Sequence, residues 1–225
     1  MTEITIYSET KKIGKRAFEG CTSLTKIIFK EPSSLLMIKD DAFKGCRSLE
    51  KISIPSTVTT IGWRVFKKCE KLKDIIIPSS VTFIGDNAFD ECISLSSVTF
   101  EGPSSLNHLG RFAFNKCSSL KEILIPSSLD EIKEGTFKDC YSLEKVTFEE
   151  PSSLISINDF AFKACIVLNN VVIPPSVNSI GDFAFHRCHL LKEITIPESV
   201  TNIGDNALSQ LSFEDIDDKT HCMIF

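Results

Sequence analysis

The sequence predicts an α/β repeat solenoid, a stack of similar coils that each contribute one short strand and one helical turn. The first observation is the regular spacing of cysteine, because eight of the nine cysteines lie 23 or 25 residues apart. They are Cys21, Cys46, Cys69, Cys92, Cys117, Cys140, Cys165 and Cys188. The second is a motif in register with them, I-G-x-x-A-F-x-x-C-x-S-L-x-x-I-x-I-P-x-S-V-x-x. A fixed period of this length is typical of repeat architectures, in which each unit contacts only its neighbours.

The strand of each unit is its L-x-x-I-x-I-P segment. In residues 120–126, Ile123 and Ile125 are two positions apart, so their side chains point to the same face. The proline that follows ends the pairing because it has no N–H to donate. Each of the three 25-residue steps carries two extra residues after a strand-ending Phe, at 30–31, 101–102 and 149–150. An insertion at one fixed place indicates a surface loop.

The G-D-x-A-F-x-x-C segment is predicted to be one or two helical turns. Aspartate follows the glycine or its equivalent in several units, as at Asp86, Asp159, Asp182 and Asp205. We expect it to cap the turn, and the Phe and Cys three residues apart to share one face. Helical turns pack ~8–10 Å apart, whereas strands lie ~4.8 Å apart. This mismatch predicts a curved stack, with a parallel sheet on the concave side and helical turns on the convex side.

The regular cysteines are predicted to be reduced, buried residues. If they follow the helical turns, their spacing of ~8–10 Å exceeds the ~7 Å that a disulfide allows between Cα atoms. No Cys-x-x-Cys pair indicates zinc. His186 and His189 flank Cys188, but Cys188 occupies a regular inward position. We therefore expect no metal, no cofactor and no nucleophilic site.

Composition narrows the possible partners. The chain has 225 residues, a formal charge of -5 and a pI of about 5.5. No run of Lys or Arg is present, which argues against nucleic acid as a partner. The N-terminus lacks the basic and apolar regions of a signal peptide, and no segment approaches the ~20 apolar residues of a membrane span.

The unit resembles the BspA-like class of leucine-rich repeats, over residues 4–208. The resemblance implies a curved right-handed superhelix that binds proteins, and several relatives are surface proteins or adhesins. The family pattern includes no catalytic residue, so we expect no enzyme. We predict a repeat domain at residues 1–208, with eight 23- or 25-residue units plus partial ends. Residues 209–225 are predicted to be a cap remnant and a flexible tail.

The concave face offers a candidate partner-binding strip. The strand residue between the two inward positions points outward, and large apolar residues alternate there with Ser or Thr. The apolar ones are Ile28, Ile76, Leu124 and Val172, and the charged residues of the adjacent column are Lys26, Lys51, Asp74, Glu122, Lys145 and Glu193. Two interpretations stand: the β-propensity of an exposed sheet, or a binding strip with apolar anchors ~10 Å apart.

Four aromatic residues beside the predicted turn are a second candidate partner-binding site. Trp63, Phe112, Phe160 and Phe183 occupy positions that are polar in other units. Filling the core at a lateral edge and forming an interaction patch are both consistent with this pattern.

The C-terminal residues fit a prenylation (CaaX) box. Cys222 precedes two apolar residues and a final Phe225, which favours a geranylgeranyl lipid attached by a prenyltransferase. Two alternatives stay open: these residues fold back as a cap, or they enter a carboxylate-binding groove. Four acidic residues between 214 and 218 would be repelled by an anionic membrane, so we expect weak, reversible attachment.

The leading functional hypothesis is a non-enzymatic, protein-binding scaffold or adaptor. It would be cytoplasmic and peripheral on the cytoplasmic face of a membrane, held there by the lipid on Cys222. The alternative is an adhesin-like surface or secreted protein that binds host or extracellular ligands.

Overall fold

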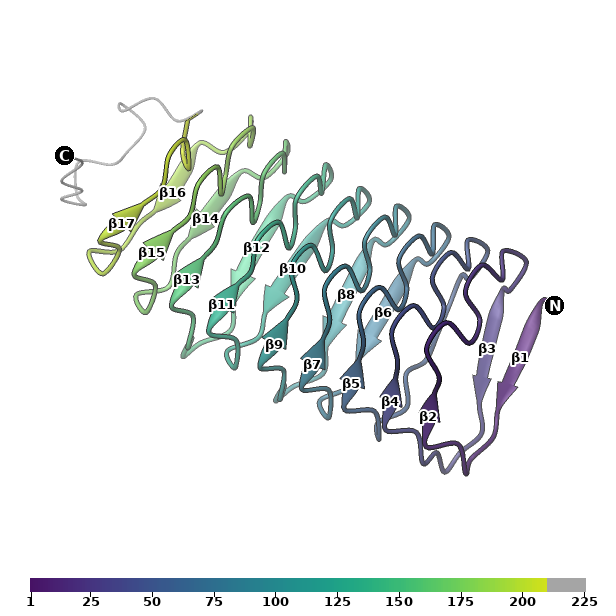
Figure 1. Cartoon of the computed structure of the whole chain (residues 1–225). Coiled ribbons are helices and arrows are strands. Elements are labelled where there is room, and N and C mark those ends of the chain that lie inside the picture. The colour runs from purple at the N-terminus through teal and green to yellow at the C-terminus, as the bar shows by residue number, and fades with distance from the viewer. Residues whose placement is uncertain (210–225) are drawn as a thin grey trace.

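A computed structural model describes residues 1–209, which form one row of stacked coils (Figure 1). Each coil contributes a two-residue strand and, except for the coil at Lys51, a longer strand. The longer strands are β1 (Glu3–Ile6), β3 (Lys26–Phe29), β6 (Asp74–Ile77), β8 (Ser97–Phe100), β10 (Glu122–Ile125), β12 (Lys145–Phe148), β14 (Asn170–Val172) and β16 (Glu193–Thr195). The short ones are β2 (Lys12–Ile13), β4 (Met37–Ile38), β5 (Thr60–Ile61), β7 (Phe83–Ile84), β9 (His108–Leu109), β11 (Glu131–Ile132), β13 (Ser156–Ile157), β15 (Ser179–Ile180) and β17 (Asn202–Ile203).

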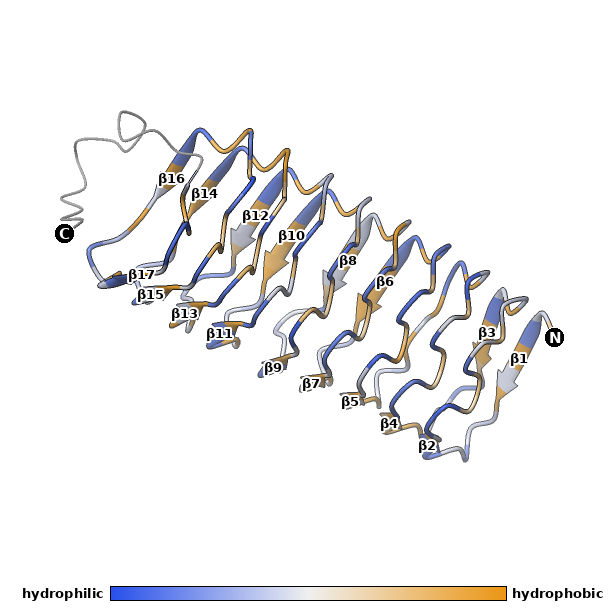
Figure 2. Ribbon diagram, turned by 45° about the horizontal axis from the view of Figure 1, so that its top comes forward, coloured by the Kyte–Doolittle hydropathy of each residue, from blue (hydrophilic) through white to orange (hydrophobic). Residues whose placement is uncertain are grey.

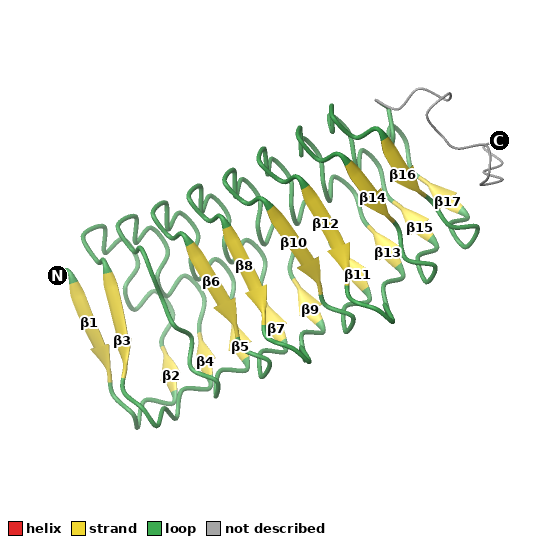
Figure 3. Cartoon of the chain, turned by 180° about the vertical axis from the view of Figure 1, so that it is seen from behind, coloured by secondary structure: helices red, strands yellow, loops and turns green. Residues whose placement is uncertain are grey.

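The strands form two rows of parallel sheets on different sides of the stack (Figure 3). The longer strands pair as β1-β3, β6-β8 and β10-β12-β14-β16, and the short strands as β2-β4-β5-β7-β9 and β11-β13-β15-β17. Equivalent residues of successive coils are partners, so that Ile123 lies beside Val146. The repeat period therefore sets the register throughout. No helix capable of crossing a membrane occurs in residues 1–209.

The predicted helical turns are wrong, because the described part of the chain contains no helix. Each turn has two residues of left-handed backbone, such as Asn87 (φ 57°) and Glu91 (φ 62°), and an α-helix cannot contain such residues. Alternate N–H groups of the turn bond to the next coil: Asn87 N to the Arg111 carbonyl at 2.9 Å and Glu91 N to the Asn115 carbonyl at 2.9 Å. The turns are thus joined across coils, as strands are.

The aspartates predicted to cap helices instead connect neighbouring coils. The Asp86 carboxylate accepts a hydrogen bond from the Arg111 backbone N–H at 2.8 Å. The Asp159 carboxylate does the same for the Asp182 N–H at 2.8 Å. The N-cap chemistry is therefore present, but the donor belongs to the following coil.

The core is a ladder of phenylalanine rings. Phe43, Phe66, Phe89, Phe114, Phe137, Phe162 and Phe185 are fully buried. Together with Phe18 they stack with ring centroids 5.1–5.7 Å apart. The turn side therefore repeats at nearly the strand spacing instead of at the ~8–10 Å of packed helices. A large difference in spacing between the two sides is therefore absent from the described coils, and curvature and handedness stay predictions.

The eight regular cysteines are free thiols, as predicted, and seven of them are buried. The reason differs from the one expected, because the coils are close together. Each buried Sγ atom donates to the carbonyl of a Phe in the preceding coil, as Cys92 does to Phe66 at 3.1 Å. Burial raises the pKa of Cys46 and of Cys188 to about 12. These thiols are therefore protonated core residues.

The pairing of the longer strands is lost or reduced after each strand that ends in Phe. Strand β8 has no backbone pairing with β10, and β12 pairs with β14 only at Lys145 and Asn170. After β3 only an isolated bridge joins Lys26 to Lys51. The two-residue insertions follow these same strands. The breaks divide the outer surface of the longer strands, which we call the sheet face.

Candidate functional site

Large apolar side chains on the sheet face are exposed where the sequence predicts them. The exposed fractions are 52 % for Ile76, 51 % for Leu124 and 60 % for Val172, whereas Ile28 is half-buried. Their strand neighbours point inward, as Ile123 shows at 2 % exposure. Figure 2 shows the alternation, with more orange in β6 and β10 than in β8 and β12. The binding role of this sheet-face strip stays a prediction.

Each exposed apolar residue of the strip lies beside a hydroxyl residue. Ile76 is the partner of Thr99, and Leu124 is the partner of Thr147. The apolar residues recur every 48 residues, which is every second coil. Paired strands ~4.8 Å apart would place consecutive anchors ~10 Å apart. The step from Ile76 to Leu124 crosses the unpaired strands β8 and β10, so this spacing does not apply to it. This spacing suits side chains of a partner that contacts alternate strands.

The charged column next to the strip is exposed along its whole length. It comprises Lys26, Lys51, Asp74, Glu122, Lys145 and Glu193. Glu122 is the register partner of Lys145, so opposite charges adjoin there. Lys26 and Lys51 are bridged neighbours of like charge. The column thus changes from basic to mixed along the stack.

The break between β8 and β10 opens a hollow beside Leu124. It has a volume of about 250 Å³, and Thr99, Phe100, Glu122 and Thr147 also line it. Without backbone pairing, the two strands leave room for a side chain. A leucine-sized group of a partner fits a volume of this order. Sequence reasoning did not find this hollow because strand pairing cannot be read from one unit.

The four lateral aromatic residues do not form one patch. Phe160 and Phe183 stack with centroids 5.4 Å apart, and the Lys163 ammonium lies 5.1 Å from the Phe160 ring centre. Phe112 packs against Gly135, where an added Cβ atom would collide with the ring. Trp63 is separate and 50 % exposed. None of the four is in the buried core, because Phe112, Phe160 and Phe183 are half-buried and Trp63 is exposed.

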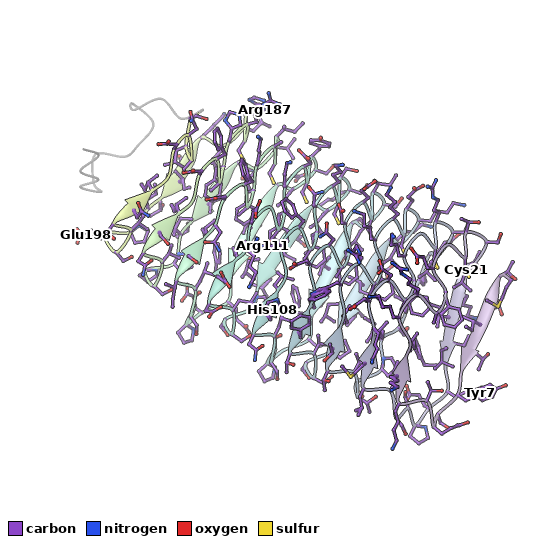
Figure 4. The ribbon with its side chains drawn as sticks, viewed as in Figure 1. Tyr7, Cys21, His108, Arg111, Arg187 and Glu198 are labelled. Carbon is purple, nitrogen blue, oxygen red and sulfur yellow. The ribbon has the colours of Figure 1, made fainter. Side chains whose placement is uncertain are left out.

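Trp63 helps to form a second hollow, which we call the Trp63 hollow. It has a volume of about 360 Å³, and its apolar walls are Met37, Trp63 and Phe83. The Phe83 ring stacks on His108 at 4.4 Å, and His108 lies midway along the stack (Figure 4). Sequence analysis missed Met37 and Phe83. Both precede the leading apolar residue of a unit, a position that is polar in most units.

Charge is distributed unevenly along the stack. Residues 1–73 contain 15 Lys and Arg against 8 Asp and Glu, whereas residues 74–209 contain 9 against 18. The net charges are therefore +7 and -9. The described part of the chain therefore consists of a basic third, residues 1–73, followed by an acidic remainder, residues 74–209.

A buried carboxylate anchors the basic third. Asp41 is 0 % exposed, and the Arg64 guanidinium donates to both of its oxygens at 2.8 and 3.0 Å. Arg16 and Lys44 lie 3.8 and 3.7 Å from the same carboxylate. The hydrogen bonds from Arg64 hold the pKa of Asp41 below its usual range. Three cations around one buried acid make this a structural cluster.

The side chains around Cys188 do not form a reactive site. The Cys188 thiol donates to the Phe162 carbonyl at 3.2 Å. His186 Nδ1 lies 2.7 Å from the Ser209 hydroxyl, and the His186 ring packs edge-on against Phe183. Within residues 1–209, no cluster of three His, Cys, Asp or Glu side chains is placed to bind a metal. The proposed lipidation site, Cys222, lies outside the described residues.

The chain is similar to solved structures of bacterial proteins. A leucine-rich repeat protein of T. pallidum is 26 % identical, with a TM-score of 0.64, covering 84 % of this chain and 77 % of that one. A leucine-rich repeat protein of Eubacterium ventriosum is 17 % identical, with a TM-score of 0.55, covering 100 % and 86 %. A protein of Faecalibacterium prausnitzii, described as a leucine rich cell surface protein, is 23 % identical, with a TM-score of 0.49, covering 98 % and 83 %.

Sequence comparison gives the family. No functionally curated protein matches the chain. The model of the BspA type leucine rich repeat region matches in six copies, over residues 1–105, 36–165 and 84–216. These matches span most of the chain and coincide with the coils of the structure. The chain belongs to the BspA-type leucine-rich repeat family.

Proposed function

We propose that this protein is a non-enzymatic protein-binding module whose sheet face receives the partner. The observation that carries the proposal is the strip of half-exposed Ile76, Leu124 and Val172 on a sheet with a fully packed core. Exposed apolar groups in a row mark interaction sites, because covering them removes apolar surface from water. The family supports a repeat scaffold and supplies no catalytic pattern.

The chemistry of the strip suggests how a partner would be held. Apolar side chains of the partner would cover the anchors, and one would enter the hollow beside Leu124. The flanking Glu122 and Lys145 would select its orientation through charge, since rim charges govern specificity more than affinity. The central apolar residues would contribute most of the binding energy.

A serine variant of the strip tests this proposal. Ile76→Ser, Leu124→Ser and Val172→Ser are combined, and affinity purification from the native host is quantified by mass spectrometry. The control is Leu36→Ser with Ile155→Ser, because these residues are 47 % and 49 % exposed but lie outside the longer strands. Loss of the same proteins in the strip variant alone supports the proposal. Equal recovery from both variants contradicts it.

We further propose that the protein is peripheral on the cytoplasmic face of a membrane, attached by a prenyl group on Cys222. The support is the C-terminal sequence alone. The test is the intact mass of protein purified from a eukaryotic host, beside a Cys222→Ser control. One added prenyl group, absent in the control, is the expected result. An unmodified mass would overturn this part and leave the sheet-face proposal intact.

The alternative is a surface or secreted adhesin-like protein that uses the same sheet face for host or extracellular ligands. Protease treatment of intact cells separates the two locations. Digestion of the protein on intact cells would place it outside, whereas digestion only after lysis would place it inside.

A further inference from the structure

The Trp63 hollow combines an aromatic wall with a basic rim. The Trp63 ring lies against Gly85 of the next coil, where an added Cβ atom would collide with it. Its position is fixed further by the hydrogen bond from its backbone N–H to Asp40 at 3.2 Å. Half of the side chain is nevertheless exposed. The hollow therefore presents a held aromatic surface and not a loose side chain.

The rim of this hollow is positively charged. Lys15 and Lys39 line it, and Lys12 is the register partner of Met37. The acidic residue of the lining is Asp40, which is 3.9 Å from Lys15. Lys39 has no ion pair with any residue of 1–209. The hollow thus fits a negatively charged segment that carries a bulky apolar side chain.

The chain itself contains a segment of this chemistry, Phe213-Glu214-Asp215-Ile216-Asp217-Asp218. It has two large apolar residues and four carboxylates. We propose that the Trp63 hollow binds residues 213–218 of a second copy of this chain. The proposal rests on the proposed function as a protein-binding module and names one partner for a surface distinct from the sheet face.

Distance favours a segment from another copy. The ninth coil, at Ile203, is six coils from the one at Ile61, and coils repeat at 5.1–5.7 Å. The separation along the stack is therefore ~30 Å, and Figure 1 shows the two regions toward opposite ends. From Ser209, a fully extended chain reaches ~14 Å by Phe213 and ~25 Å by Ile216. Phe213 is therefore well short of the hollow of its own molecule, and Ile216 on a fully extended chain would reach no further than its near wall at Phe83, five coils away.

The resulting contact joins the acidic end of one molecule to the basic third of another. Two different surfaces meet, so the contact is head-to-tail and each molecule can bind at both ends. Residues 1–73 have a net charge of +7 and residues 74–209 a net charge of -9, and the attraction between these opposite charges favours this orientation. The attraction between exposed charges is screened within ~10 Å at 0.1 M salt, so the association weakens with ionic strength.

Sedimentation velocity of the full chain tests the proposal. We expect the sedimentation coefficient to rise with protein concentration at low salt, and the rise to be lost at high salt. Phe213→Ser with Ile216→Ser should weaken association about tenfold or more while leaving every charge in place. Leu36→Ser is the matched control, because it is equally apolar and 47 % exposed but does not line the hollow. A concentration-independent monomer in the wild type would overturn the proposal.

Charge exchange identifies the two surfaces. Lys15→Glu with Lys39→Glu should abolish association, and so should the replacement of Glu214, Asp215, Asp217 and Asp218 by Lys. Mixing the two variants should restore association, because one supplies the native hollow and the other the native acidic segment. The chain that combines all six substitutions should associate again, because its hollow is then acidic and its segment basic. Failure of this restoration would overturn the proposal. The sheet-face serine variant should associate like the wild type. A failure of the proposed self-association would therefore leave the proposed function of the sheet face untouched.

Discussion

The substitution Phe114→Ala measures how much one ring of the phenylalanine ladder contributes to the free energy of unfolding. Phe114 is 0 % exposed and lies between Phe89 and Phe137, with centroids 5.1 and 5.6 Å away. Phe114→Ala leaves a cavity between two coils that cannot close, because the backbone hydrogen bonds of the turns fix their separation. Substitutions of this kind cost ~3–5 kcal/mol. That is a large part of the ~5–15 kcal/mol by which a typical domain is stable.

The assay is urea denaturation followed by far-ultraviolet circular dichroism, with Phe18→Ala as the matched control. Phe18 is partly exposed and has one ring neighbour, Phe43 at 5.3 Å. We expect Phe18→Ala to cost about half as much, ~1.5–2.5 kcal/mol, because less apolar surface returns to water. For an m-value of ~2–3 kcal/mol/M, the Phe114 variant should lower the midpoint by ~1–2 M urea. Equal costs at the two sites would refute the reasoning.

Three further predictions concern thiols, pH and backbone. In the Cys222→Ser background, native alkylation should label Cys21 alone, because the other seven thiols are buried, and intact mass reads the number of adducts. Arg64→Ala should destabilise the fold by ~2–3 kcal/mol at neutral pH, since Asp41 keeps two other cations. The lowered pKa of Asp41 means that its stabilisation is complete above pH ~3.9 and is lost as pH falls further, so the two melting curves should converge in acid. Gly135→Ala should cost ~1–2 kcal/mol or more, because φ is +59° and the ring beside it must move, which thermal unfolding measures.

The repeat period accounted for most of the fold in advance. Inward positions such as Ile123 and Ile125 and the ends of the strands were predictable, because the same residue types recur at fixed spacing and only a stacked structure buries them all. The turns were not predictable in this way. Glycine occupies their left-handed positions only at Gly20, Gly45 and Gly135, and the other units carry residues such as Asn87 and Phe112, so glycine does not mark these positions consistently. Their hydrogen bonds run between coils, which local spacing does not reveal.

The candidate surfaces were predictable in part. The outward direction of Leu124 follows from the alternation of a strand, and the structure shows that side chain exposed. The hollow beside it depends on the missing pairing between β8 and β10, which a single unit does not show. Met37 and Phe83 lie in different coils and form a wall with Trp63 only after stacking. An alignment of the repeat units would have revealed Met37 and Phe83, because both are apolar residues at a position that is polar in most units.

Site-specific photo-crosslinking in the native host tests the central claim most directly. A photoreactive residue replaces Leu124 on the sheet face in one variant and the exposed Lys116 on the turn side in another. We expect a discrete cross-linked protein from position 124 and none from position 116. Cross-links from position 116 alone, or the same products from both positions, would contradict the assignment of partner binding to the sheet face.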